Sequence, residues 1–168
     1  MLIEPAVPAD VTVLTAIAHA AKRHWGYPEA WIRQWATTLT LTPDYLARHA
    51  VFVARERDKV VGFCALTLEQ RPAGTRALHE TGDTQLDHLW VLPAAMGRGI
   101  GRVLFTHAQQ HARQLGARRL WVESDPHAED FYRHMGLTVF GRQPAPMDGQ
   151  ERFLPLMEMR LDTHSPSS

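Results

Sequence analysis

Three alternating glycines, Gly97, Gly99 and Gly101, mark the stretch whose residue types and spacing point most directly to chemistry. Glycine lets a backbone turn sharply and approach a ligand closely, since it carries no Cβ. A helical pattern of apolar residues follows, and the first N–H groups of a helix form a positive end that binds phosphate. Arg98 and Arg102 add positive charge there. A plain strand-to-helix connection needs no such spacing, so the stretch predicts a phosphate site.

Two familiar phosphate motifs fit this stretch poorly. A Walker A loop requires Lys and then Ser or Thr after its last glycine, whereas Arg102 and Val103 follow Gly101. A dinucleotide-binding fingerprint, G-x-G-x-x-G, requires its third glycine at the position of Arg102. That motif also expects an acidic residue about twenty positions further on, and Glu123 supplies one. A dinucleotide-dependent oxidoreductase therefore stays open as the weaker alternative.

The neighbouring segments predict a strand, a helix and a second strand around the glycines. Residues 86–92 form an apolar, partly alternating run, ended by Pro93, which has no N–H for a sheet. The apolar stripe that begins after Arg102 predicts a helix ending at Gly116. Residues 118–123 predict the next strand. A helical crossover between two strands makes them parallel neighbours.

The rest of the chain predicts further strands and helices of a mixed α/β fold. Residues 50–55 and 59–67 are apolar runs joined by a short charged turn, the pattern of an antiparallel hairpin. The other expected elements are a strand at 2–7, helices that begin near residues 8, 28, 43 and 126, strands at 137–141 and 153–161, and loops at 70–83 and 142–152. We expect one domain over residues 1–162 and a disordered polar tail at 163–168.

Composition narrows the function classes. The 168 residues carry 18 basic and 18 acidic side chains, so neither nucleic acid nor a membrane surface is expected as a partner. Cys64, the single cysteine, lies in an apolar run and can form no internal disulfide. The first residues lack the pattern of a signal peptide, and no run reaches transmembrane length; we expect a cytoplasmic protein. The scattered histidines predict no metal site.

An aromatic segment stands out at residues 24–35, which hold three of the five tryptophans. Trp31 and Trp35 are expected on a helix that packs against the core. His24, Trp25 and Tyr27 lie in a turn, where aromatic side chains with polar tips line binding sites. These three residues are candidates for an acceptor pocket that holds an ammonium or an aromatic amine.

Two motifs together resemble those of the GNAT acetyltransferase superfamily. The first, residues 96–101 with Met96 at its start, is similar to the acyl-CoA loop Q/R-x-x-G-x-G/A. The second, A-x-x-x-Y-x-x-x-G-[F/L], is matched by Ala128, Tyr132, Gly136 and Leu137 at the same spacing. The resemblance covers about residues 50–140 and implies a single-domain α/β (α+β mixed sheet) fold. That fold has about seven mostly antiparallel strands, a splayed parallel central pair and about four to five helices.

The resemblance implies an acetyl-CoA-dependent N-acetyltransferase with acetyl-CoA as co-substrate. Its pantetheine would lie between the strands at 86–92 and 118–123, and its pyrophosphate at residues 97–103. The implied cofactor-binding residues are Leu89, Trp90, Val91, Gly97, Arg98, Gly99, Ile100, Gly101, Arg102, Val103, His127 and Tyr132. The acceptor would be a primary amine of a small molecule or an amino terminus. Homodimers are common in the family, and no residue pattern decides the point here.

The implied reaction is direct attack of a neutral amine on a thioester. The resemblance places Tyr132 as the acid that protonates the departing thiolate. Three residues are candidates for the base: Asp87, His88 and Glu123, the last also a candidate for substrate binding. As neighbours on one strand, Asp87 and His88 point to opposite faces; alternation places Asp87 with Leu89 and Val91, and His88 with Leu86 and Trp90. A GNAT-like sensor that binds acyl-CoA without turnover is the further alternative.

Overall fold

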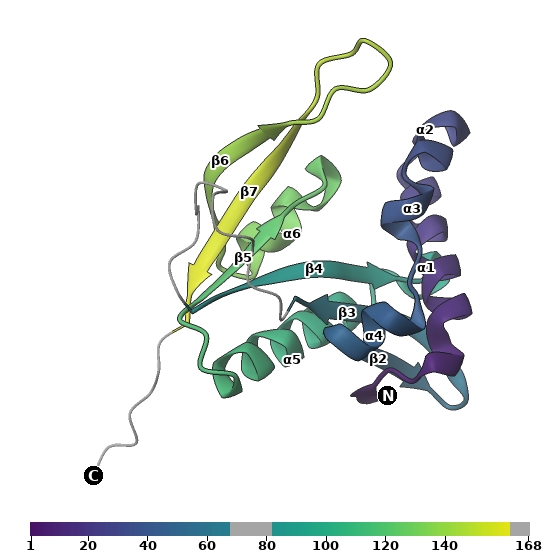
Figure 1. The fold of residues 1–168 in the computed structure, drawn as a ribbon, viewed down its shortest axis with the longest axis vertical. Coiled ribbons are helices and arrows are strands. Elements are labelled where there is room, and N and C mark those ends of the chain that lie inside the picture. Colours follow the sequence, from purple (N-terminus) through teal and green to yellow (C-terminus); the bar gives the residue numbers. More distant parts are fainter. Residues whose placement is uncertain (68–81, 162–168) are drawn as a thin grey trace.

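Seven strands form one mixed sheet in the order β1-β2-β3-β4-β5-β7-β6 (Figure 1). The computed structural model describes residues 1–67 and 82–161. The strands are β1 (Leu2–Pro5), β2 (Ala50–Glu56), β3 (Lys59–Leu66), β4 (Asp83–Val91), β5 (Arg119–Glu123), β6 (Thr138–Pro144) and β7 (Phe153–Arg160). β4 and β5 are parallel and the other neighbours are antiparallel, which confirms the predicted sheet.

Six α-helices lie within the described residues: α1 (Val11–His24), α2 (Glu29–Gln34), α3 (Ala36–Leu39), α4 (Pro43–Arg48), α5 (Ile100–Gln114) and α6 (Glu129–His134). Short 3-10 turns occur at Pro8–Asp10, Pro93–Ala95 and Pro126–Ala128. The count exceeds the predicted four to five because the helix expected after Pro28 is divided at Trp35. In the described part of the chain, no helix has the length and apolar character needed to span a membrane.

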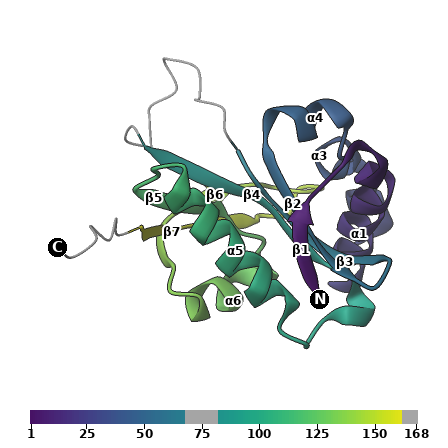
Figure 2. The same ribbon diagram turned by 90° about the horizontal axis from the view of Figure 1, so that it is seen from below.

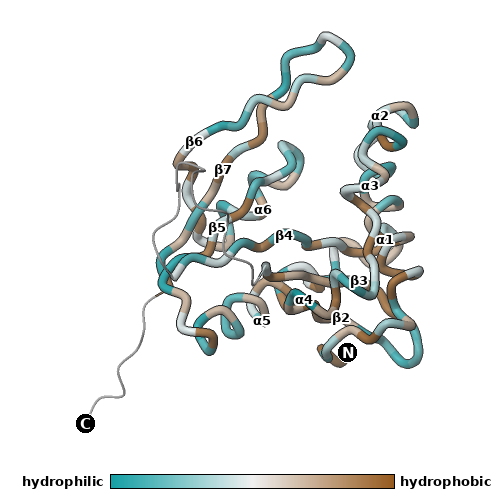
Figure 3. Tube along the Cα trace, viewed as in Figure 1, coloured by the Kyte–Doolittle hydropathy of each residue, from teal (hydrophilic) through white to brown (hydrophobic). Residues whose placement is uncertain are grey.

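The sheet separates two apolar cores. Figure 2 shows α5 on one face of the sheet and α1 with α3 on the other. One core lies under α5, where Leu104, Phe105 and Ala108 are fully buried. The other lies under α1 and α3, and includes Leu14 and Ile17. β2 serves both cores because its side chains alternate between the two faces. The turn between β2 and β3 is hydrophilic, as Figure 3 shows, in agreement with the predicted hairpin.

The two parallel strands pair only at their beginnings. Asp83–Gln85 of β4 lies beside Arg119–Trp121 of β5, and the pairing stops there although both strands continue. The other edge of β4 stays bonded to β3 as far as Val91. In Figure 1, β4 and β5 diverge from this point. Among residues 1–67 and 82–161, one edge of β4 therefore has no strand partner beyond Gln85, and the predicted splay is confirmed.

A β-bulge in β4 changes which side chains share a face. Ala65 is opposite His88, and Leu66 is opposite Leu86, so Asp87 is an extra residue. Leu86 consequently packs in the α5 core together with Leu89 and Val91, whereas Trp90 packs against the α1 core. The expectation that His88 shares a face with Leu86 was wrong, because simple alternation fails at a bulge.

Other boundaries shift modestly from the predictions. β4 begins at Asp83 rather than at residue 86. The predicted helix from Pro126 divides into a 3-10 turn and α6. Most of the loop expected at 70–83 and the tail expected at 163–168 lie outside the described residues.

Candidate active site

The glycine turn joins β4 to α5 with its backbone exposed. Gly97 and Gly99 have φ angles of +76° and +80°, a conformation that L side chains rarely adopt, and a Cβ on either would point into open space. Gly99 is the N-cap of α5 and supplies no side-chain cap. The first helical bond runs from the N–H of Val103 to the carbonyl of Gly99, so the preceding N–H groups have no partner within the helix. This arrangement can bind a phosphate.

Gly101 has a different role from the two glycines before it. A Cβ at Gly101 would lie 3.5 Å from the Phe131 ring and 3.8 Å from Val91. A methyl group there would be in ordinary van der Waals contact with both, so Gly101 marks the place where the first turn of α5 packs against α6 and β4. The turn predicted from three glycines is made by Gly97 and Gly99 alone.

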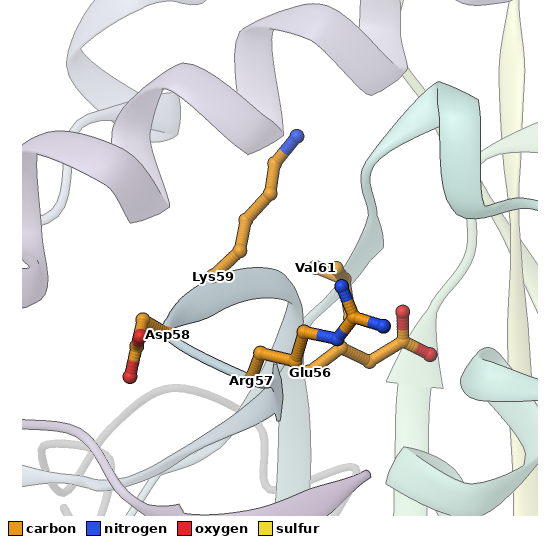
Figure 4. A pocket seen from close by; sticks show the side chains of 5 residues that line it. All are labelled: Glu56, Arg57, Asp58, Lys59 and Val61. Carbon is orange, nitrogen blue, oxygen red and sulfur yellow. The ribbon is translucent and has the colours of Figure 1, made fainter.

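The two arginines beside the turn differ in their surroundings. The Nη2 of Arg98 lies 2.5 Å from the carboxylate of Glu56, which draws Arg98 toward the β2–β3 turn. A hollow at that turn is lined by Glu56 and the next residues of the hairpin (Figure 4). Arg102 is exposed in the first turn of α5. Arg102 is therefore the better placed of the two to add charge to a bound phosphate.

Tyr132 is buried on α6, at 5% exposure, in the core under α5. Its ring packs edge-on against Phe131, with ring centroids 5.2 Å apart, and against Phe105 at 6.2 Å. Burial raises the pKa of the Tyr132 phenol, and the nearby Cys64 and Asp125 raise it further. The phenol is thus kept protonated at neutral pH, as a proton donor must be.

His88 and Asp87 are both engaged with neighbours. The indole N–H of Trp90 donates to Nδ1 of His88 over 3.0 Å. The hydroxyl of Tyr45 donates to Asp87 over 2.5 Å, and Nε2 of His88 lies 3.6 Å from the same carboxylate. Burial lowers the pKa of His88, so the ring is neutral with its proton on the nitrogen that faces Asp87. The lone pair that a base would use is occupied by Trp90.

Four aromatic rings surround the ammonium of Lys22, near the end of α1. The Nζ atom lies 4.2 Å from the ring centroid of Trp35, 5.0 Å from that of Tyr27, and 5.8 Å from those of Trp25 and Trp90. We call these five residues, together with Asp125, His127 and Arg152, the Lys22 cluster. The ammonium that this aromatic box holds is thus one of the chain's own.

Asp125 is the anion of the Lys22 cluster. It follows β5 and accepts from Lys22 Nζ at 2.7 Å, from the Tyr27 hydroxyl at 3.0 Å and from the backbone N–H of His127 at 2.9 Å. The His127 ring lies 3.0 Å from the same carboxylate and stacks on Trp25. Burial by itself raises the pKa of Asp125, but Lys22 and these hydrogen bonds outweigh it and hold the pKa below its ordinary value.

The remaining predicted residues are more dispersed. His24 is exposed at the last position of α1. Glu123 is the exposed last residue of β5, on the face opposite to Leu120 and Val122, which pack in the α5 core. Trp35 packs against the α1 core as expected, and the indole of Trp31 donates to Asp148 over 2.6 Å.

The sequence reasoning did not single out Lys22 or Arg152. Lys22 lies one turn after Ala18, which is fully buried, so its place on the apolar stripe of α1 was a usable signal. Arg152 lies in a polar loop with no such pattern. It enters the cluster through the fold alone.

The family model described as Acetyltransferase (GNAT) family matches residues 14–137, from α1 to the residue before β6. The chain belongs to the GNAT acetyltransferase family. The matched residues include the glycine turn, the parted strands and Tyr132.

Solved GNAT structures resemble the chain over nearly its whole length. YncA of Salmonella typhimurium, solved with its cofactor acetyl-CoA, has a TM-score of 0.70 and 22% identity, with 100% of this chain and 98% of the other covered. The PaiA N-acetyltransferase of Thermoplasma acidophilum, solved with coenzyme A, has a TM-score of 0.69 and 17% identity, with 95% and 99% covered. At these identities the likeness is one of fold.

A curated relative matches a shorter segment. The streptothricin acetyltransferase of Streptomyces lavendulae is 39% identical over 67 residues, which are 38% of this chain. The match spans 35% of that relative, about a third of its length. The segment is therefore similar to part of an acetyltransferase and carries no substrate over to this chain.

Proposed function

We propose that the chain is an acetyl-CoA-dependent N-acetyltransferase that moves an acetyl group directly to a primary amine of a small molecule or an amino terminus. The observation that carries the proposal is the open edge of β4 beyond Gln85, with the bare glycine turn at its end. An extended pantetheine can bond to such an edge as a strand would, and a diphosphate can bind the turn.

The residues present fit coenzyme A. Open space around Gly97 and Gly99 leaves room for phosphate oxygens beside the backbone, and Arg102 adds charge. The backbone of Leu89, Trp90 and Val91 lies on the strand whose edge is open. The cofactor supplies the activated acetyl group as a thioester. His127, predicted to contact the cofactor, lies with Asp125 beyond the end of β5.

We assign Tyr132 as the acid of the reaction. As the amine nitrogen bonds to the acetyl carbon, the carbon–sulfur bond breaks and the thiolate takes a proton from the phenol. The raised pKa of Tyr132 suits a group that must hold its proton until that moment. The phenolate then recovers a proton from solvent, and the amine loses one to a base.

We assign Glu123 as that base from its place in the fold alone, since all three candidates interact with other residues. Glu123 lies where β5 has parted from β4, on the face away from the α5 core. His88 and Asp87 are held by Trp90 and Tyr45. We assign His88 as a positioning residue for the Trp90 indole. Glu123, at the end of β5, is then the group that accepts the proton, directly or through water.

One observation favours a second candidate, an acyl-CoA-binding protein without turnover. Trp25 and Tyr27, two of the residues expected to line an acceptor pocket, lie against the Lys22 ammonium, and Asp125 is its counter-ion. A protein that only senses acyl-CoA has no need of an acceptor site. It would still require the open strand edge and the glycine turn.

Two measurements separate these candidates. The first is thiol release from acetyl-CoA with a panel of amines, and the second is the shift in melting temperature with CoA and with NAD. We expect stabilisation by CoA, none by NAD, and amine-dependent thiol release that Tyr132→Phe suppresses. Stabilisation by CoA without turnover on any amine would favour the sensor. Stabilisation by NAD alone would overturn both candidates.

A further inference from the structure

The Lys22 cluster contains more positive charge than negative. Lys22 and Arg152 are 12% and 11% exposed, and the carboxylate that faces both is Asp125, at 7%. Asp125 is already occupied by Lys22, Tyr27 and His127. Its nearest approach to Arg152 is 3.5 Å, longer than a direct hydrogen bond between charged groups. One buried positive charge therefore lacks a direct anionic partner within the described residues.

Arg152 carries that unmatched charge. Its Nη2 donates to the Tyr27 hydroxyl over 3.1 Å, and its guanidinium lies over the rings of Tyr27 and Trp35 at 5.3 and 5.0 Å. A guanidinium has five N–H donors in a planar fork. The loop before β7 has two carboxylates: Asp148 accepts from Trp31 instead, and Glu151 is exposed. Several donors of Arg152 thus stay available on a cation that is buried among rings.

A buried cation of this kind is stabilised when an anion binds beside it and balances its charge. Cation–π contacts offset only part of the free energy that is lost when an unpaired charge is buried. A carboxylate matches the guanidinium fork with two parallel hydrogen bonds and carries the single negative charge that the cluster lacks. Tyr27 links Arg152 to Asp125, which follows the end of β5. An anion bound to Arg152 would thus be connected through Tyr27 and Asp125 to the place where the strands part.

We propose that Arg152 is the carboxylate-binding residue of the acceptor site, and that the acceptor is an amine bearing a carboxylate, as in an amino acid. This proposal rests on the proposed function. Arg152 binds the carboxylate, the rings of Tyr27 and Trp35 flank it, and the amine of the same molecule faces the end of β5. Lys22 remains the counter-ion of Asp125 and does not contact the acceptor.

The test uses matched acceptors that differ only in the carboxylate. For phenylalanine, leucine and lysine, the free amino acid is compared with its carboxamide and with its decarboxylated amine, by thiol release from acetyl-CoA. We expect kcat/KM at least about tenfold higher for a free acid. Arg152→Gln should lower kcat/KM for that acid about 100-fold, mainly through KM, and leave the carboxamide unchanged. Arg152→Lys keeps the charge but not the planar fork of donors, so it should recover only part of the kcat/KM that Arg152→Gln loses for the acid.

Arg142→Gln is the matched control, because Arg142 is an exposed arginine on β6 that pairs with Glu129 outside the cluster. Equal rates for acid and carboxamide, or equal losses for both in Arg152→Gln, would overturn the proposal. A binding readout separates this outcome from failure of the proposed function. Tryptophan fluorescence, titrated with the amino acids in the presence of CoA, should report binding that Arg152→Gln removes.

Binding without turnover would leave the carboxylate site standing and refute the acetyltransferase. Turnover without a preference for the carboxylate would support the acetyltransferase and refute the carboxylate site. If no free acid binds and none is turned over, the proposed carboxylate site is overturned. Inorganic phosphate and sulfate are titrated in parallel, and competition by these ions as strong as that by the acids would identify a general anion site instead.

Discussion

The ammonium of Lys22 lies 2.7 Å from the carboxylate of Asp125, although 103 positions separate the two residues in the chain. Lys22 is near the end of α1 and Asp125 follows β5, so the ion pair joins the N-terminal helix to the place where the central strands have parted. Both side chains are nearly buried, at 12% and 7% exposure. This ion pair therefore holds α1 against the end of β5, beside the candidate acceptor site.

Removing one member of this pair should destabilise the fold. Lys22→Met leaves Asp125 buried without its cation, and we expect the free energy of unfolding to fall by about 3 kcal/mol in urea titrations. The double variant Lys22→Met with Asp125→Asn should recover part of this loss, because no charge is then left unpaired. Lys59→Met, at the exposed β2–β3 turn, should change stability by no more than about 0.5 kcal/mol. An equal loss in the single and double variants would contradict the pairing.

Gly99 and Gly149 offer a matched test of the glycine turn. Their φ angles are +80° and +75°, and a Cβ on either would meet open space. Ala at each position should therefore cost a similar amount, about 1–2 kcal/mol, through backbone conformation alone. Only Gly99→Ala should weaken CoA binding, by about tenfold or more, since Gly149 lies in the loop between β6 and β7. Calorimetric titration with CoA measures this difference, and equal affinities in both variants would exclude the turn as the diphosphate site.

Tyr132→Phe should affect turnover far more than binding. Loss of the proton donor is expected to lower kcat about 100-fold, with the KM for acetyl-CoA nearly unchanged. The ring contacts with Phe105 and Phe131 remain, so the melting temperature should move little. Because the pKa of Tyr132 is raised, the wild-type rate should not decline on the alkaline side until above pH 10 on account of this group. An unchanged kcat in the variant would remove Tyr132 from the chemistry.

Local motifs were the most predictable part of the molecule. The glycine turn and the position of Tyr132 depend on short-range spacing, and both are where the sequence predicts them. The parting of β4 from β5 followed from the family resemblance and not from periodicity. The bulge at Asp87 could not be foreseen, because a period of two cannot show that one residue of the strand is extra.

The Lys22 cluster was only half predictable. The types of Trp25 and Tyr27 and their place in a turn predicted an acceptor site, which stays a prediction. The structure brings their rings together with Trp35 around Lys22. The charges between the rings come from Lys22 and Arg152, which meet only because α1 and the start of β7 reach the same end of the sheet. Contacts of this separation are set by tertiary structure.

The bond from Trp90 to His88 makes stability depend on pH. Nδ1 of His88 can accept from the indole only while the ring is neutral. Burial lowers the pKa of His88 from its ordinary value of 6.5, the charge of Asp87 offsets part of this, and His49 adds to the lowering. The rings of Tyr45 and Phe63 are the other groups packed against it. In the window that begins near pH 6.5 and extends below it, the unfolded state binds a proton that the folded state does not. Stability therefore falls as pH falls, by at most about 1.4 kcal/mol per pH unit.

His88→Gln tests this dependence, because a glutamine oxygen can accept from Trp90 and does not titrate. Urea titrations between pH 5 and 7.5 should show a smaller loss of stability on acidification for the variant than for the wild type. His107, whose pKa is also lowered by burial, contributes to both curves, so the difference between them is the measurement. Parallel curves would show that His88 does not titrate in this range. If His88 also acted as the base, the variant would lose kcat about 100-fold; as a positioning residue for Trp90, it should mainly raise the KM for the acceptor.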